Sequence, residues 1–415
     1  MQMKTLLALL LFGGSLIQAA AQLSDRISDW PQWRGRNRDG ISKETGLLKA
    51  WPDGGPELKW STREVGVGYG GPALVGSRLY LIGDLPDGCY VMALERASGQ
   101  RVWRTRVGPP GGNSSYPGTR ATPSIDGDLL ITMTQHGDVV CLELPEGRLR
   151  WQKNLERDLG GNRPMWHFGE SPLVDGDQVI CTPGGAQGTL AALDKRTGAV
   201  LWRSRGITNP PAYCSVILAE CAGVRQYVQL TPQNVFGVEA QSGLPLWSVP
   251  REGVRAIVPT PVSAGDFVYV TSGYGLGCNL YRIANSAGGL AATEVHAGKS
   301  LVNHHGGVVK LGDQLFGHSD GAGWTCQDFA TGKVIWQDRG VGKGSVTYAD
   351  GHLYCRSEDG PVALVEASPA RYRERSRFRQ PERSSKKAWP HPVVAGGCLY
   401  LRDQEVLLCY DIKLP

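Results

Sequence analysis

Short apolar segments that follow glycine turns recur along most of the chain. In Gly351-His352-Leu353-Tyr354 and Gly397-Cys398-Leu399-Tyr400 a glycine is followed three residues later by an aromatic residue. Glycine permits a tight turn, and the apolar run behind it has the length of a strand. Eight such segments begin at Gly76, Gly127, Gly176, Gly223, Gly265, Gly312, Gly351 and Gly397. The pattern predicts an all-β protein built from eight similar units.

A second pattern, an acidic residue followed by Gly four residues later and Trp after four more, occurs five times. The sets are Glu95/Gly99/Trp103, Glu143/Gly147/Trp151, Asp194/Gly198/Trp202, Glu239/Gly243/Trp247 and Asp328/Gly332/Trp336. Successive tryptophans lie 45 to 51 residues apart, except for one double interval that contains a degenerate copy. Repeats of this length with four strands each are the blades of a β-propeller. We therefore predict an eight-bladed β-propeller of four-stranded antiparallel blades, in which Trp fills the wedge between neighbouring blades.

The two ends of the repeat region predict how the ring closes. The eighth repeat reaches Asp411-Ile412 and then lacks its outer strand, while Pro56-Glu57-Leu58-Lys59-Trp60 reads as an isolated strand. Pairing of the N- and C-terminal strands would close the ring and leave no open sheet edge. We assign residues 57–415 to the propeller and residues 22–56 to an N-terminal extension.

The first residues read as an export signal. An apolar run from Leu6 to Ile17 follows Lys4 and ends in Ala19-Ala20-Ala21. This predicts a cleaved signal peptide over residues 1–21, with a membrane anchor or a buried helix as the alternatives. No Cys follows the run, so we expect a periplasmic or secreted protein without a lipid anchor or a membrane span, and a monomer.

Composition and charge refine this expectation. The 415 residues include 56 Gly, 26 Pro and 12 Trp, which suits many short strands joined by turns. The net charge of +5 is concentrated in the segment Arg371–Lys387, where five arginines occupy alternate positions. On a strand they would share one face, as a solvated edge or as a contact for an anionic partner such as a polysaccharide or a lipid head group. Nucleic acid is not an expected partner of an exported chain.

Ten cysteines occur singly inside apolar strand patterns, so we expect buried free thiols. Cys398 and Cys409 flank a predicted turn at Asp403-Gln404 and form the one pair that we nominate as a disulfide. The chain has no CxxC and no HExxH spacing, and we predict no metal site.

These motifs resemble a known superfamily. The pattern Ala-x-Asp-x-x-x-Gly-x-x-x-Trp is similar to the tryptophan-docking repeat of quinoprotein-like, PQQ-binding-like eight-bladed propellers. The opening Asp29–Gly35 and Arg38-Asp39-Gly40 segments, His304–Gly307, Gly323–Phe329 and His391–Val394 resemble exported members of that group. The superfamily includes pyrroloquinoline quinone (PQQ) alcohol dehydrogenases and the propeller lipoprotein of the outer-membrane β-barrel assembly machinery. The chain lacks the adjacent cysteine pair of the dehydrogenases and the lipidated Cys of the lipoprotein.

The inner strands of a propeller begin near one mouth of its channel, so polar residues at the blade starts should converge there. These residues are Tyr69, Arg120, Glu170, Tyr213, Thr260, His304, His305, Lys343 and His391, with Trp166 and His167 just before the third blade. Arg120, Glu170, His305, Lys343 and His391 are our candidate binding residues, and we predict no catalytic residue. Adjacent strand residues point to opposite faces, so His304 and His305 should not bind one metal together unless the chain bends there.

Three interpretations of this ring stay open. It is a structural polar plug, or it binds an anionic, sugar or peptide ligand without chemistry, or, as the resemblance implies, it holds PQQ and calcium. A calcium ion needs six to eight oxygen ligands, and the ring supplies one carboxylate, Glu170. The sequence therefore favours a non-catalytic binding or scaffold propeller with a protein or polysaccharide partner and no cofactor. A PQQ-dependent alcohol or polyol dehydrogenase is the alternative.

Overall fold

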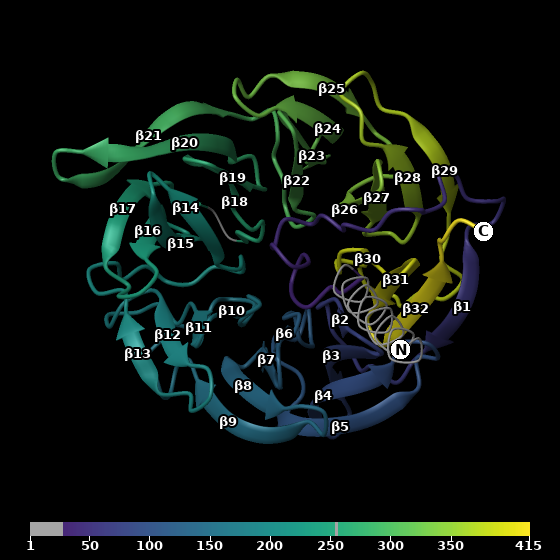
Figure 1. Cartoon of the computed structure of the whole chain (residues 1–415), viewed down its shortest axis with the longest axis horizontal. Coiled ribbons are helices and arrows are strands. Elements are labelled where there is room, and N and C mark those ends of the chain that lie inside the picture. Colours follow the sequence, from purple (N-terminus) through teal and green to yellow (C-terminus); the bar gives the residue numbers. More distant parts are fainter. Residues whose placement is uncertain (1–27, 254–255) are drawn as a thin grey trace, which may run out of the picture.

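The computed structural model describes residues 28–253 and 256–415, and the predicted signal peptide lies outside these residues. Eight four-stranded antiparallel sheets form a closed ring, and the described residues contain no helix. Figure 1 shows the blades arranged around a central channel, with the first strand of each blade innermost. The prediction of an eight-bladed all-β propeller is confirmed.

Each blade follows the chain from its inner strand to its outer strand, and the eighth blade takes its outer strand from the N-terminal side. The blades are β2 (Ala73–Val75), β3 (Arg78–Leu85), β4 (Gly88–Glu95), β5 (Arg101–Gly108); β6 (Ser124–Asp126), β7 (Leu129–Met133), β8 (Asp138–Glu143), β9 (Arg148–Asn154); β10 (Leu173–Asp175), β11 (Gln178–Cys181), β12 (Ala191–Asp194), β13 (Val200–Arg203); β14 (Ile217–Cys221), β15 (Val224–Leu230), β16 (Asn234–Glu239), β17 (Pro245–Pro250); β18 (Val262–Ala264), β19 (Phe267–Ser272), β20 (Gly277–Ser286), β21 (Gly289–Gly298); β22 (Val308–Leu311), β23 (Gln314–Ser319), β24 (Gly323–Asp328), β25 (Val334–Asp338); β26 (Gly344–Ala349), β27 (His352–Ser357), β28 (Val362–Glu366), β29 (Glu374–Phe378); and β30 (Val393–Ala395), β31 (Cys398–Asp403), β32 (Val406–Asp411), β1 (Glu57–Thr62).

The ring closes through the pairing of β1 with β32, as predicted. Leu58 lies opposite Tyr410 and Thr62 lies opposite Leu407, in an antiparallel register with one irregularity. The eighth sheet therefore has the order β1-β32-β31-β30 and is completed by both ends of the repeat region. Because β1 completes this blade, β32 is not left as an unpaired outer edge.

The two glycine patterns have separate structural roles. The eight glycines that mark the repeats lie in the turns between the first and second strands, with φ between 53° and 83°. The glycines of the second pattern lie between the third and fourth strands and contact the outer-strand Trp of the preceding blade. A Cβ atom on Gly147 would lie 2.5 Å from the Trp103 ring, and one on Gly99 would lie 2.5 Å from Trp60. Trp is thus docked onto the next blade, where a side chain at the turn would exclude it.

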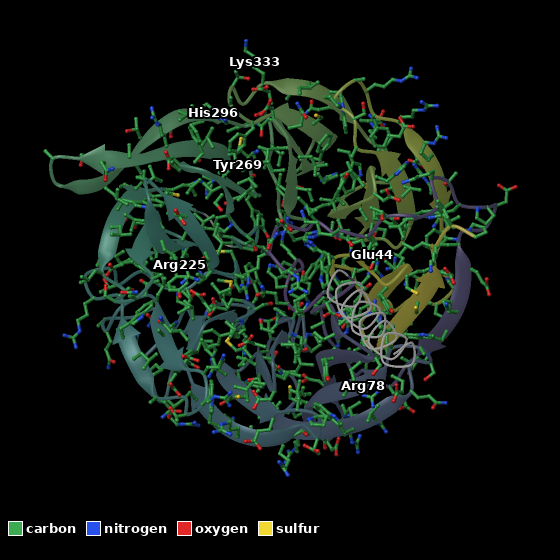
Figure 2. All side chains as sticks on the ribbon, viewed as in Figure 1. Glu44, Arg78, Arg225, Tyr269, His296 and Lys333 are labelled. Carbon is green, nitrogen blue, oxygen red and sulfur yellow. The ribbon has the colours of Figure 1, made fainter. Side chains whose placement is uncertain are left out.

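The degenerate copy of the repeat uses a histidine in place of Trp. His296 on β21 contacts Gly332 of the next blade, and its Nε2 lies 3.0 Å from the carbonyl oxygen of Phe329. Figure 2 shows His296 close to Lys333, which follows Gly332, with Tyr269 further towards the channel. The fifth blade therefore docks onto the glycine turn of the sixth blade although it lacks the Trp of the repeat.

Replacing Gly147 by Ala should destabilise the protein more than the same change at Gly127. Both glycines belong to the second blade and have φ near 70° and 59°, so each Ala carries a left-handed backbone cost of about 1–2 kcal/mol. A Cβ at Gly127 meets open space, whereas one at Gly147 collides with Trp103. We expect Gly147→Ala to lower the free energy of unfolding by roughly 1–3 kcal/mol more than Gly127→Ala. Urea unfolding measures the difference, and equal costs would mean that Trp docking contributes nothing.

The N-terminal segment crosses the channel of the propeller. Trp30 pairs with Leu74 on β2 and Ile41 pairs with Tyr348 on β26, so the segment runs from the first blade to the seventh. Figure 1 shows this stretch passing through the middle of the ring. Between these points Arg34 and Arg38 are buried and donate hydrogen bonds to main-chain carbonyl groups of blades on both sides. The sequence predicted only an extension, and the structure shows that part of it closes the channel.

The cysteines are buried free thiols, as the strand patterns predicted. The nominated bridge between Cys398 and Cys409 is wrong, because both thiols are free. In the β31–β32 hairpin Cys409 lies opposite Tyr400, while Cys398 lies opposite Asp411. The two cysteines are thus diagonal neighbours, since the turn begins one residue later than the sequence suggested.

The basic segment forms the outer edge of the seventh blade. The arginines at alternate positions are all exposed, while the intervening residues point inwards, as expected for a strand with one solvated face. Arg373 and Arg375 both lie within 3.5 Å of Glu366, and Arg377 pairs with Glu374 at 2.7 Å. Part of the charge is therefore balanced within the blade itself.

Candidate binding cavity at the channel mouth

A cavity of about 180 Å³ lies at the end of the channel where the inner strands begin. Most of its lining comes from the segments just before the inner strands, which confirms that the blade starts converge. The lining residues are Trp33, Tyr69, Tyr116, Arg120, Trp166, Gly169, Ser171, Tyr213, Ser215, Ala256, Val258, Tyr274, His304, His305, Trp389 and His391. The volume is well above the ~15 Å³ that one water needs and below the ~300 Å³ of drug-sized sites. A small ligand or part of a larger one would fit.

Aromatic rings form most of the cavity wall. Trp389 lies between Tyr69 and Tyr116, with ring centroids 4.9 and 5.1 Å apart. Trp166 packs against Tyr213 at 5.9 Å on another side. Such pairs hold each other in place by edge and offset contacts, so the walls are preformed.

The floor of the cavity is supplied by the N-terminal segment. Trp33 packs against His391 with ring centroids 4.7 Å apart, and its indole N–H donates a hydrogen bond to Thr260 Oγ1 at 2.9 Å. The segment that closes the channel therefore also completes the cavity.

Arg120 is the cationic residue that lines the cavity. Its guanidinium donates hydrogen bonds to the carbonyl oxygens of Gly118 at 3.0 Å and Tyr116 at 2.7 Å, and it lies 5.8 Å from the Tyr69 ring centroid. No carboxylate of the described residues forms an ion pair with it. Burial lowers the pKa of Arg120, yet arginine stays charged at neutral pH. The guanidinium is fixed by two carbonyls and keeps further N–H groups for a ligand.

Three histidines also line the cavity. His305 Nε2 lies 2.9 Å from Glu358 Oε2, and His391 Nε2 lies 3.2 Å from the carbonyl oxygen of His305. Both are more than nine-tenths buried, and the Nδ1 atom of each has no hydrogen-bond partner. His304 Nδ1 lies 2.9 Å from the ammonium of Lys343. Burial lowers the pKa of His304 to about 4 and that of His391 to about 3, so these two rings are neutral at pH 7.

The structure brings three of the five candidate residues into one cavity. Arg120, His305 and His391 line it. Lys343 does not line the cavity. Its ammonium contacts His304, which does, and forms an ion pair with Asp320 at 2.9 Å. Whether these residues bind a ligand stays a prediction.

Glu170 points away from the cavity. Its carboxylate accepts hydrogen bonds from the main-chain N–H of Thr182 at 2.5 Å and from Thr182 Oγ1 at 2.6 Å. Burial raises the pKa of Glu170 to about 7. Its neighbours Gly169 and Ser171 do line the cavity, as expected when side chains alternate along an extended chain.

His304 and His305 do not point to opposite faces, because both residues line the cavity. The pair lies in a bend before β22, where alternation does not apply, and the two ring centroids are 5.2 Å apart. Among the described residues no group of three or more His, Cys, Asp or Glu could hold a metal ion.

Two residues of the site were missed because they come from a second set of turns on the same face. In each blade the second strand ends where the first begins, so the turn before the third strand also reaches the channel mouth. Tyr274 and Glu358 lie in such turns. Glu358 accepts from Trp389 Nε1 at 3.2 Å as well as contacting His305, and therefore orients two lining residues. Reading these turns along with the blade starts would have found it.

The lining does not fit a calcium-bound quinone. Calcium requires six to eight oxygen ligands, usually including carboxylates, and none of the lining residues is Asp or Glu. Nearby carboxylates are already engaged, Glu358 by His305 and Lys387, and Asp320 by Lys343. The cavity could accept a flat anionic molecule beside Arg120, but it offers no donor set for the metal.

Comparison with known proteins identifies the family. The model of the family described as outer membrane protein assembly factor BamB matches residues 87–338, which is more than half of the chain. The chain belongs to this family. The matched region covers most of the first six blades, including all five copies of the Gly-Trp pattern.

Individual members of the family are distant relatives. BamB of Shewanella oneidensis is 23% identical over 57% of this chain and 56% of its own length. BamB of Burkholderia pseudomallei is 26% identical over 50% of this chain and 64% of its own length. The match thus spans little more than half of the length of these curated relatives.

Solved structures share the fold. BamB from Moraxella catarrhalis superposes with a TM-score of 0.57 at 17% identity, over 80% of this chain and 94% of that one. Quinohemoprotein alcohol dehydrogenase from Comamonas testosteroni gives 0.63 at 10% identity, over 93% and 81%. At these identities the likeness shows the propeller fold alone. Within residues 28–253 and 256–415, no helix is long and apolar enough to cross a membrane.

Proposed function

We propose that this protein is a non-catalytic binding propeller that takes part in the assembly of outer-membrane proteins. The observation that carries the proposal is the family match over residues 87–338, together with relatives named as outer membrane protein assembly factors. In this role the chain acts in the periplasm or outside the cell, and its partners are proteins. The propeller supplies a rigid ring whose loops and outer strands are available for contacts.

The chemistry of the cavity supports a binding role. Its lining contains no carboxylate that could act as a base beside a substrate hydroxyl, and the residues do not fit calcium. We propose accordingly that the protein works without PQQ. The dehydrogenase alternative has the support of the shared fold alone, and a fold does not establish an activity.

Deletion of the gene in the source organism tests the proposal. We expect a lower amount of folded outer-membrane β-barrel proteins, measured by their heat-modifiable mobility in gels, and restoration by the wild-type chain. A soluble exported protein serves as the control and should be unchanged. In parallel, the purified protein is mixed with PQQ and Ca²⁺ and assayed for dye-linked alcohol oxidation, where we expect no turnover. Unchanged barrel levels would overturn the assembly role, and quinone-dependent turnover would overturn the non-catalytic one.

A further inference from the structure

We propose that the cavity at the channel mouth binds a carboxylate-bearing sugar of the uronic acid class. The ligand's ring would pack between the aromatic walls, its carboxylate would pair with Arg120, and its hydroxyl groups would bond to polar atoms of the lining. This ligand chemistry goes beyond the assembly role and does not depend on it.

The aromatic walls favour a ligand with flat, weakly polar faces. Trp389 with its neighbours Tyr69 and Tyr116, and Trp166 with Tyr213, form two groups of aromatic rings in the lining. The face of an aromatic ring is the negative side of its quadrupole, and the axial C–H groups of a sugar ring carry partial positive charge. A pyranose can therefore pack on these rings without losing the hydrogen bonds of its equatorial hydroxyl groups.

Arg120 selects for an anion. Its guanidinium lines the cavity, is half-buried, and has no carboxylate partner among the described residues, so the cation lacks a counter-charge. An arginine fork matches a carboxylate in a bidentate geometry, and bonds between charged groups are about twice as strong as neutral ones. Gly169 leaves room at this point, because a Cβ there would lie 3.3 Å from Arg120 Cδ and 3.4 Å from the Tyr213 ring.

Serine hydroxyl groups favour a ligand with several hydroxyl groups of its own. The hydroxyl groups of Ser171 and Ser215 line the wall and accept from main-chain N–H groups, which leaves their own O–H groups to donate. A simple aromatic acid would leave these groups unpaired, whereas a sugar acid would not.

Titration of the purified protein with methyl glucuronide and methyl galacturonide tests the proposal. The tryptophans of the cavity report binding through their fluorescence, and calorimetry gives the affinity. We expect saturable binding of at least one of the uronides, and at least tenfold weaker binding of methyl glucoside and methyl galactoside, which lack the carboxylate. Acetate carries the carboxylate alone, and benzoate carries it on a flat aromatic ring without hydroxyl groups. Both should bind at least tenfold more weakly than the uronide.

Variants assign the site. Arg120→Gln should weaken uronide binding about 10- to 100-fold and leave the weak binding of the neutral glycosides unchanged. Tyr116→Ala, at the partly exposed rim, should weaken both classes of sugar. Arg371→Gln is the matched control, since this arginine is exposed on the outer edge far along the blade from the channel mouth, and it should have no effect. Circular dichroism verifies that each variant is folded.

Three results with the sugars would overturn the proposal: no binding of either uronide at 10 mM, equal affinity for uronides and neutral glycosides, or an unchanged affinity in Arg120→Gln. Because these measurements use purified protein and small sugars, their failure is distinct from the failure of the assembly role, which is measured in cells. Binding of benzoate as tightly as the uronide would show instead that the cavity takes aromatic acids, and would also overturn it.

Discussion

Replacement of Arg402 by Met should lower the free energy of unfolding by more than about 3 kcal/mol. Arg402 lies on β31 of the eighth blade, is 1% exposed, and donates hydrogen bonds to four carbonyl oxygens, one on β3 of the first blade and three in the segment that connects β1 to β2. The acceptors, at 2.7 to 3.3 Å, are those of Val65, Gly66, Gly70 and Ile82. Met keeps the length and the apolar stem but removes every donor. Each buried acceptor left without a partner costs about 1–3 kcal/mol, less what relaxation recovers.

The position of Arg402 makes the loss specific to ring closure. The eighth blade is held by the pairing of β1 with β32, and Arg402 adds a second connection between the eighth and first blades. Urea unfolding of the variant gives the stability. Arg371→Met is the control and should change it by less than about 0.5 kcal/mol, because that side chain is exposed. Arg402→Lys, which keeps a charge but not the fork, should lie between them. A loss below 1 kcal/mol in Arg402→Met would contradict the role of this arginine.

Repeated local constraints made the fold predictable. Each blade needs a left-handed turn between its first two strands, and eight of these turns are supplied by Gly at regular spacing. Trp103 and its counterparts need a bare turn on the next blade, which links a local motif to the contact between blades. The glycine turn appears in the sequence at all eight copies, so even the blade with His296 in place of Trp could be counted.

The channel segment and the buried arginines could not be read from the sequence. The guanidinium groups of Arg34, Arg38 and Arg402 donate to main-chain carbonyl groups, which every residue has, so no residue type in the sequence marks these arginines as buried. The prediction that the blade starts converge succeeded because strand direction decides it. It misplaced Glu170, because a shift of one residue in an extended segment turns a side chain from the cavity to the interior of the blade.

Stability should fall as the pH is lowered from 6.5 towards 4. Burial lowers the pKa of His391 to about 3 and those of His304 and His318 to about 4. In the unfolded chain these histidines bind protons near pH 6.5. Between that pH and their lower pKa values in the folded protein, the unfolded state therefore takes up protons that the folded state does not. Glu170 acts in the opposite direction between pH 7 and 4.5, because its pKa of about 7 makes the folded state bind its proton more tightly. Three histidines outweigh one carboxyl, so the net effect of acid is destabilising.

Two variants separate these opposing contributions. His391 packs near Arg34 and the carbonyl of His305, and His391→Gln can keep the hydrogen bond to that carbonyl while removing the titrating ring. Its stability should decline less steeply between pH 6.5 and 4, by roughly 1.4 kcal/mol per pH unit for the one proton removed. Glu170→Gln removes the opposing group, so its decline should be steeper than that of the wild type between pH 7 and 4.5. Urea unfolding at several pH values measures both slopes. Since the two variants are expected to deviate in opposite directions, a general loss of packing cannot account for both, and parallel slopes in all three proteins would contradict the neutral state of His391 in the folded chain.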